Sequence, residues 1–257
     1  MLKMLPTDAL EHVRHRRWFY EFDLPDGART TSYLPPAVAK IHATRLQMLL
    51  QALAPIAAND WSAISVLDIA CHQGYFASHL ARRGCRDVLA VDARDEHVAD
   101  AALIADVYGL TNLRTLQADV NRLDAASVGT FDVTLLLGLL YHVENPVGVM
   151  RIARALTRRA CVIETQVVPN MTGVVDWGAH TFQRAMIGSF AIIDETDETH
   201  APEASITGIC LCPSYEALVW VLRKVGFARV ERIAPPQDAY EQHASGKRVV
   251  VVAHVAA

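Results

Sequence analysis

The stretch VLDIACHQGYFASHLARRG, residues 66–84, decides the fold of this chain. The apolar run at 64–69 predicts a buried β-strand, and the pattern at 73–83 predicts a helix directly after it. Gly74 marks a tight loop between the two elements. Strand, loop and helix in this order form half of a βαβ unit, whose strands lie parallel in an α/β sheet. In such sheets ligands bind beyond the carboxyl ends of the strands, so we expect a ligand at the loop around Gly74.

The alternation of strands and helices continues along the chain. Further strands are predicted at 87–91, 113–117, 131–137, 161–165, 228–233 and 247–254, and helices at 36–53, 94–108, 146–156 and 213–225. We expect Pro55 to end the first of these helices. Strand runs that are apolar throughout fit a parallel sheet covered by helices on both faces. The connection 234–246 is too short for a crossover helix, so the last two strands are predicted to be antiparallel.

Composition narrows the class of protein. The chain has 257 residues, of which 52% are hydrophobic, and a formal net charge of −4. This balance excludes a disordered chain and gives no general attraction to nucleic acid. The N-terminus lacks a secretory signal, and no apolar run approaches the roughly 20 residues of a membrane helix. Because the five cysteines (71, 85, 161, 210 and 212) are scattered, we expect a soluble, cytoplasmic protein with reduced thiols.

Acidic residues follow two neighbouring strands. Asp68 ends the first, and Asp92 ends the second, eighteen residues after Gly74. A carboxylate at the second position can accept hydrogen bonds from both hydroxyls of a ribose, although Asp92 could instead cap the next helix. A dinucleotide loop would have glycines where Ala70 and His72 stand. Asp68 would repel a phosphate, and it suits a ligand with a positive charge such as an α-amino group or a sulfonium.

Four motifs in order make residues 61–165 resemble the class I S-adenosylmethionine (SAM)-dependent methyltransferases. They are VLDIACHQG (66–74), AVDARDEH (90–97), LQADVNRLD (116–124) and FDVTLLLGLLYHVENP (131–146). The wording is most similar to the branch that contains the tRNA wobble-uridine carboxymethyltransferases, which also shows a stretch like WFYEFDLPDG (18–27). The motifs cover about 100 residues, and the similarity extends weakly beyond them.

The resemblance implies a doubly wound, Rossmann-like α/β fold with a seven-stranded sheet whose last strand is antiparallel. It implies SAM as the cofactor and S-adenosylhomocysteine (SAH) as the product. The residues that it places around the cofactor are Asp68, Ala70, Cys71, His72, Gly74, Asp92, Ala93, Asp119, Val120, Leu137 and Gly138. Asp92 would bind the ribose and Asp119 would lie near the adenine. Ala70 and His72 depart from the family pattern and narrow the loop. The resemblance leaves SAM and a carboxylated SAM both open.

Three residues are candidates for catalysis. Methyl transfer from a sulfonium is a direct displacement, so it needs positioning and, for a protonated nucleophile, a base. His142 follows the fourth strand, where the methyl group should emerge, and imidazole can accept a proton near neutral pH. It could instead pack the loop. Tyr141 could line the pocket or belong to the core. Glu164 could be a base, orient a substrate amine, or anchor neighbouring segments.

Aromatic residues outside the motifs are candidates for an acceptor site. They are Trp18, Tyr20 and Tyr33 upstream, and Trp177, His180 and Phe182 in an insertion at 166–212; each could equally belong to a local core. The acidic run 194–198 is expected to be a solvated loop. The basic run 12–17 is expected to be a solvated helix face in preference to a nucleic-acid patch.

These observations divide the chain and suggest a function. Residues 1–57 form a helical and aromatic segment over the active site, and residues 58–257 form the SAM-binding domain, with 166–212 as a substrate lid between strands five and six. We expect a SAM-dependent methyltransferase acting on oxygen or nitrogen of a small molecule, such as a specialised metabolite. A tRNA-modifying (carboxy)methyltransferase and a catalytically silent SAM-binding protein are the alternatives. We expect no metal site, membrane or nucleic-acid partner, and a homodimer stays open.

Overall fold

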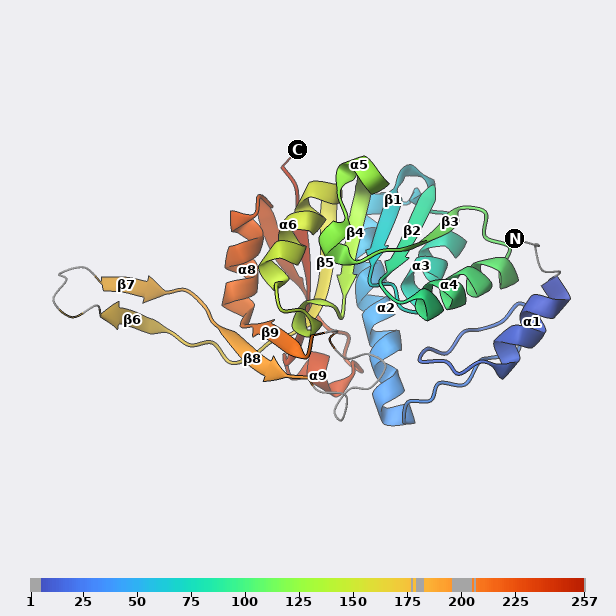
Figure 1. Ribbon diagram of the computed structural model, residues 1–257, viewed down its shortest axis with the longest axis horizontal. Coiled ribbons are helices and arrows are strands. Elements are labelled where there is room, and N and C mark those ends of the chain that lie inside the picture. Colours follow the sequence, from blue (N-terminus) through green and yellow to red (C-terminus); the bar gives the residue numbers. More distant parts are fainter. Residues whose placement is uncertain (1–5, 177, 179–182, 196–204, 206, 257) are drawn as a thin grey trace.

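A seven-stranded sheet organises the computed structural model, which describes residues 6–176, 178, 183–195, 205 and 207–256. Its strands lie in the order β10-β11-β5-β4-β1-β2-β3 (Figure 1). Their bounds are β1 Ser65–Ile69, β2 Asp87–Asp92, β3 Leu113–Gln117, β4 Phe131–Leu137, β5 Thr157–Gln166, β10 Arg229–Ile233 and β11 Arg248–His254. The first five strands pair in parallel, and β11 is antiparallel to both of its neighbours. The predicted fold, including the antiparallel last strand, is confirmed.

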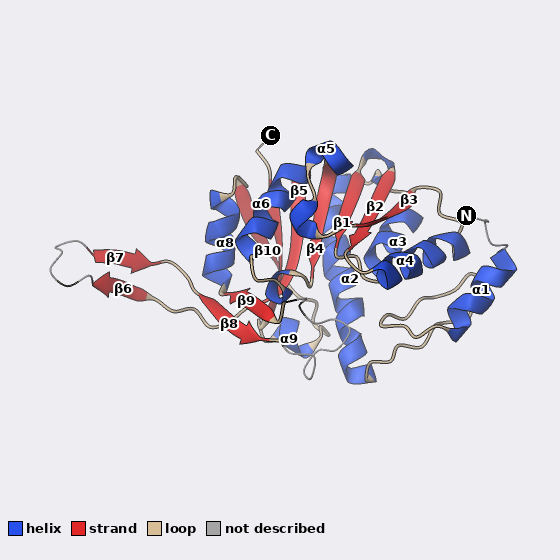
Figure 2. Cartoon of the chain, viewed as in Figure 1, coloured by secondary structure: helices blue, strands red, loops and turns tan. Residues whose placement is uncertain are grey.

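Helices cover both faces of the sheet (Figure 2). One face packs against α2 (Pro36–Ala57), α3 (Tyr75–Arg82) and α4 (Asp95–Val107), and the other against α6 (Pro146–Leu156) and α8 (Tyr215–Lys224). Shorter helices are α1 (Pro6–His15), α5 (Ala125–Val128) and α9 (Glu241–Ala244), and the single-turn helices are η1 (Trp61–Ala63), η2 (Val120–Arg122) and η3 (Leu140–His142). Val66 faces the first core and Leu67 the second. Because side chains alternate along a strand, runs apolar throughout fill two cores at once.

The N-terminal segment packs beside α3 and α4. Residues 18–34 are extended and reverse at a turn in which the Leu24 N–H donates to the Ala28 carbonyl, at 2.7 Å. The helix α2 then begins at Pro36, as predicted, but Pro55 lies inside it and does not end it. A proline removes only one helical hydrogen bond, and so close to the end of a helix this loss is tolerated.

The insertion (residues 166–212) contains four short strands that the sequence pattern did not predict. They are β6 Gly173–Asp176, β7 Gln183–Met186, β8 Phe190–Asp194 and β9 Ile209–Pro213, in two antiparallel pairs. Figure 1 shows β6 and β7 projecting away from the body of the molecule, while β8 and β9 lie against it. Val174 and Ile192 are exposed, so this segment lacks the apolar alternation that identifies a half-buried strand.

Two further features of the structure concern the cysteines and the hydrophobicity of the helices. All five cysteines are buried free thiols. In the part of the chain that the structure describes, none of the helices has both the length and the hydrophobicity to traverse a bilayer.

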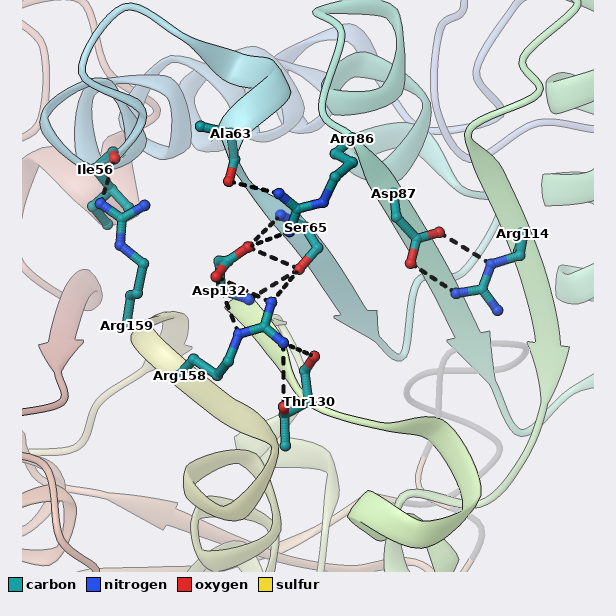
Figure 3. Close-up of polar contacts among 10 residues, drawn as sticks. All are labelled: Ile56, Ala63, Ser65, Arg86, Asp87, Arg114, Thr130, Asp132, Arg158 and Arg159. Carbon is teal, nitrogen blue, oxygen red and sulfur yellow. Dashed lines mark hydrogen bonds and ion pairs between the residues drawn. The ribbon is translucent and has the colours of Figure 1, made fainter.

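The amino ends of the strands are joined by polar contacts around Asp132 (Figure 3). Its carboxylate accepts from the Ser65 N–H at 2.8 Å, from Arg86 at 3.0 Å and from Arg158 at 3.1 Å. Although partial burial opposes ionisation, the hydrogen bonds from Ser65 and Arg158 lower the pKa of Asp132. This carboxylate therefore holds β1, β4 and β5 in register at the edge of the sheet where the strands begin.

We expect Asp132→Ala to lower the free energy of unfolding by about 2 kcal/mol, because it leaves the buried Ser65 N–H without its acceptor and removes one acceptor from each of two guanidinium groups. Urea denaturation measures the change. The matched control is Asp87→Ala. Asp87 forms an ion pair with the exposed Arg114 (Figure 3). A surface pair of this kind should contribute under about 1 kcal/mol. Equal losses in the two variants would contradict the role given to Asp132.

Candidate functional site

A cavity of about 430 Å³ opens at the carboxyl ends of β1 to β4. This is the edge of a parallel sheet at which ligands bind. Its wall contains residues that follow each of these strands, together with residues of the N-terminal segment and of the insertion. The lining residues include Phe19, Tyr20, Arg45, Ala70, His72, Asp92, Ala93, Arg94, His97, Asp119, Val120, Leu137, Gly138, Tyr141, His142, Glu144, Ser205 and Thr207.

The loop after β1 has three residues in the left-handed backbone region. The φ angles are 60° at Ala70, 51° at His72 and 75° at Gly74. The two departures from the glycine pattern therefore keep the backbone that glycine adopts freely, at a cost of about 1 to 2 kcal/mol each. At Gly74 the side chain is excluded as well, because a Cβ there would lie 2.8 Å from the Cβ of Ala101.

Contacts of His72 hold this loop in place. Its N–H donates to Asp92 at 2.9 Å, and its Nδ1 accepts from the Gln73 N–H at 2.9 Å. The imidazole stacks on His97, with 3.8 Å between ring centroids, and lies 4.9 Å from the ring of Phe19. The side chain of His72 therefore forms part of the cavity wall and occupies space that a glycine would leave open.

Asp92 lines the cavity and also lies at the start of α4. One carboxylate oxygen accepts from the His72 N–H, and the other accepts from the Arg94 N–H at 3.0 Å, at the start of α4. Burial opposes ionisation, but the hydrogen bonds from His97 and Arg94 lower the pKa of Asp92. Asp92 is therefore an ionised acceptor that lines the cavity and also supports the helix start. A carboxylate has about four acceptor positions, so capacity for a ligand remains.

Asp119 lies on the same side of the cavity. Its Oδ1 accepts from the backbone N–H and the side-chain amide of Asn121, both at 2.9 Å, and so caps the turn η2. Ala93 and Val120 line the wall beside these two carboxylates.

Three predicted cofactor residues lie behind the wall and do not line it: Asp68, Cys71 and Gly74. Asp68 is 1% exposed, and one of its oxygens has no hydrogen-bond partner among the described residues. Burial, together with the negative charge of Asp92, raises the pKa of Asp68 to about 7. The thiol of Cys71 donates to the His72 carbonyl, and burial raises its pKa. These residues shape the loop from beneath.

Glu164 is locked away from the cavity by cations. Its side chain is fully buried and accepts from Arg45 at 3.0 Å, from Arg248 at 3.2 Å and from Nε2 of His243 at 3.1 Å. Although burial opposes ionisation, Arg45 and Arg248 hold the pKa of Glu164 far below its usual range. Of the roles predicted for this residue, the geometry provides the anchor. A carboxylate with these partners has neither the access nor the basicity of a general base.

Arg45 and Tyr141 extend the Glu164 group into the cavity. The Tyr141 hydroxyl accepts from Arg248 at 3.0 Å and from Arg45 at 3.5 Å. Gly138 lies close to Arg45, because a Cβ at Gly138 would stand 3.2 Å from the guanidinium. The sequence offered one signal for Arg45, its position on the buried face of α2. Nothing in the sequence pattern pointed to its charge facing a ligand.

His142 is brought together with a carboxylate that the sequence did not reveal. Its Nδ1 lies 2.7 Å from Glu195, which is 3% exposed at the end of β8. The same carboxylate accepts from the Ser205 N–H at 2.9 Å and from the thiol of Cys210 at 3.2 Å. Burial opposes ionisation, but these contacts, led by His142, lower the pKa of Glu195 to about 2. The expectation of a solvated acidic loop is therefore wrong at Glu195, and residues 196–198 lie outside the described residues.

The predicted aromatic residues divide in a similar way. Tyr20 lines the cavity and stacks on Tyr75 at 4.8 Å, and its neighbour Phe19, which the sequence analysis did not select, lines it too. Trp18 is 1% exposed and donates its indole N–H to the Val13 carbonyl, so it belongs to the local core. Tyr33 packs on Phe19 and does not line the cavity. Trp177, His180 and Phe182 lie outside the described residues.

Part of the chain that surrounds this cavity matches known proteins. Residues 66–159 match the family model described as a methyltransferase domain. A ubiquinone biosynthesis O-methyltransferase of Acinetobacter baumannii (strain AYE) is 30% identical over 93 residues, which are 36% of this chain and 39% of that protein. A tRNA U34 carboxymethyltransferase of Desulfotalea psychrophila is 24% identical over 168 residues, 65% of this chain and 46% of that protein. The chain thus spans less than half the length of these relatives.

Solved structures share the fold over almost the whole chain. The N-terminal domain of EvdMO1, crystallised in the presence of SAH and D-fucose, has a TM-score of 0.69 at 21% identity, over 98% of this chain and 95% of that one. Magnesium protoporphyrin IX methyltransferase from Synechocystis PCC 6803 with bound SAH has a TM-score of 0.57 at 14% identity, over 99% of this chain and 96% of that one.

Residues 66–159 therefore resemble a methyltransferase domain, in a fold that solved methyltransferase structures share. The cavity at its strand ends has the size of a small-ligand site. In the part of the chain that the structure describes, no group of three or more His, Cys, Asp or Glu side chains could hold a metal ion.

We predict that Asp92→Ala weakens the binding of SAH by about tenfold or more, because it removes a charged hydrogen-bond acceptor from the cavity. Isothermal titration calorimetry measures the dissociation constant. Asp95→Ala, an exposed carboxylate three residues further on, is the control and should bind normally. Unchanged affinity in Asp92→Ala would refute the assignment of this residue to the cofactor.

The buried Asp68 carboxyl predicts a pH dependence of stability. Its pKa is about 7 in the folded protein against an ordinary value of 3.8, so folding retains a proton and stability falls as the pH rises from about 4 to 7. Asp68→Asn cannot ionise and should escape this loss, which amounts to about 1.4 kcal/mol for each pH unit of the window. Urea denaturation at several pH values measures it. Parallel stability curves for the variant and the native protein would contradict the prediction.

Proposed function

We propose that this protein transfers a methyl group from SAM to an oxygen or nitrogen atom of a small-molecule acceptor. The observation that carries the proposal is that one cavity joins the carboxyl groups of Asp92 and Asp119, at the ends of β2 and β3, to His142 beyond β4. Cofactor-binding groups and a group able to accept a proton therefore share one space.

The side chains around the cavity fit the parts of SAM. Asp92 is the acceptor for the ribose hydroxyls and Asp119 is the acceptor for the adenine amine. Leu137 and Gly138 lie at the methionine end with Arg45, whose Nε has no hydrogen-bond partner among the described residues. Arg45 and Arg248 outnumber the single buried carboxylate Glu164, so this end suits the carboxylate of the methionine part. When bound, SAM supplies an electrophilic methyl group on a sulfonium.

The chain supplies positioning and a base. His142 lines the cavity and is 16% exposed, so its ring can meet an acceptor and is largely shielded from water. An acceptor hydroxyl must lose a proton as the new bond to the methyl carbon forms, and a protonated amine must lose one before its lone pair can attack that carbon. Imidazole suits this task near neutral pH. Tyr141, held by Arg248, fixes the turn that carries His142.

The charge of the site favours a small acceptor over tRNA. The cavity wall has Arg45 and Arg94 against Asp92, Asp119 and Glu144, so it is not a positive surface. In the basic run 12–17, Arg14 pairs with Asp26 and Arg16 with Asp100. Phosphate binding needs cations that are available along a continuous surface. Because EvdMO1 was crystallised with D-fucose, sugars are the first class of acceptor to test.

The experiment is a screen of hydroxylated and amine-containing acceptors, sugars included, for SAH formation from SAM. Calorimetry with SAM and SAH accompanies it. Turnover with a small acceptor supports the proposal. Methylation of tRNA, with binding that weakens steeply as salt rises, would replace it with the tRNA-modifying alternative. Binding of SAM without turnover of any acceptor would favour a catalytically silent SAM-binding protein.

We expect His142→Asn to lower kcat by about a hundredfold or more while the dissociation constant of SAH stays within about twofold, because a general base acts on the chemical step. Turnover is followed with an acceptor from the screen. His254→Asn, at the opposite edge of the sheet, is the control. Equal losses of turnover and affinity would instead make His142 a cofactor-binding residue.

A further inference from the structure

We infer that Glu195, contributed by the insertion (residues 166–212), is the positioning residue for His142, so that the insertion supplies part of the catalytic machinery. The inference rests on the proposed function, in which His142 accepts the acceptor's proton. It adds a second residue from a segment outside the matched methyltransferase domain.

The geometry around Glu195 is that of a built acceptor site. The carboxylate is buried, and three donors from three places in the chain converge on it: His142 at 2.7 Å, the Ser205 N–H at 2.9 Å and the Cys210 thiol at 3.2 Å. A buried carboxylate is costly unless it is hydrogen-bonded in this way. A glutamate side chain with these partners is fixed, and so is the imidazole that it contacts.

The chemistry of the pair determines the tautomer of His142. An ionised carboxylate can only accept, so the Nδ1 atom facing Glu195 carries a hydrogen. In the neutral ring Nε2 then has the lone pair and is the atom that takes the acceptor's proton. The resulting imidazolium is stabilised by the negative charge of Glu195. Among the residues that the structure describes, the ionisable side chains nearby include Tyr141 on the same turn, Glu144 on the loop that follows and Cys210 on β9.

Backbone contacts join the insertion to the turn that carries His142. The Leu211 N–H of β9 donates to the Val143 carbonyl at 3.1 Å, and the Glu195 N–H donates to the Gly208 carbonyl at 3.1 Å. Ser205 and Thr207, between the two strands of this pair, line the same cavity. The segment that borders the acceptor side therefore also carries the carboxylate. The orientation of His142 therefore depends on the packing of β8 and β9 against the turn that carries it.

The first test needs no acceptor and makes its measurement on the native chain. Nitrogen-15 NMR of the histidine rings in the full chain, with and without SAH, reports which ring nitrogen of His142 carries the hydrogen; His142→Asn identifies the signal. We expect the neutral ring to carry it on Nδ1. A neutral ring protonated on Nε2 would overturn the inference, whatever the activity.

The second test separates positioning from folding. Glu195→Gln keeps the shape but removes the charge, and one of its two terminal atoms no longer accepts; Asp194→Asn, its exposed neighbour, removes the same charge as a control. We expect kcat in Glu195→Gln to fall about tenfold to a hundredfold, and the acidic limb of its pH–rate profile to move to lower pH. The SAH affinity of Glu195→Gln should stay unchanged, and the control should keep the SAH affinity and the thermal stability of the native protein.

The outcomes distinguish the inference from the proposed function. If His142→Asn keeps full turnover, the proposed base is wrong. If His142→Asn loses turnover but Glu195→Gln keeps the rate and pH profile of the native protein, the base stands and the positioning role of Glu195 is wrong. If Glu195→Gln does not fold, the NMR measurement on the native chain decides.

Discussion

The buried Glu164 is the constraint on which the architecture of the site depends. One carboxylate on β5 holds Arg45 of α2, Arg248 of β11 and His243 of α9. Breaking a buried ion pair is costly, while the intact pair adds little net stability, so such groups fix an arrangement more than they strengthen it. Here the arrangement that is fixed joins α2 and the last strand, β11, to β5. It also sets Arg45 in the wall of the cavity.

The loop after β1 shows how this chain keeps a ligand-binding backbone without the usual glycines. Ala70 and His72 adopt positive φ angles, which cost free energy for any residue with a Cβ. The contacts of His72 with Asp92, His97 and Phe19 offset that cost. The side chain of His72 thus stabilises a backbone that glycine would adopt freely, and it adds an imidazole to the cavity wall beside that of His97.

Sequence reasoning predicted what depends on local pattern. Apolar runs identified the sheet, and strand-end motifs placed Asp92, Asp119 and His142 at one cavity, because parallel strands end at the same edge. It failed where a role depends on distant partners. Glu164 ends a strand next to the site, but its carboxylate is paired with Arg45 of α2 and Arg248 of β11. Glu195 was expected to be one acid in a solvated run, yet it contacts His142. Neither pairing has a fixed spacing along the chain, so no pattern could reveal it.

The two halves of the proposed reaction belong to different parts of the chain. The residues available to the cofactor come mostly from 66–159, the part that matches the methyltransferase family model. Phe19, Tyr20, Ser205 and Thr207, which complete the cavity, come from outside it. If Glu195 also positions the base, then segments outside 66–159 both contact the acceptor and help to activate it. A change of acceptor in such a protein would require both properties to change at once, which ties substrate choice to catalysis through one hydrogen bond.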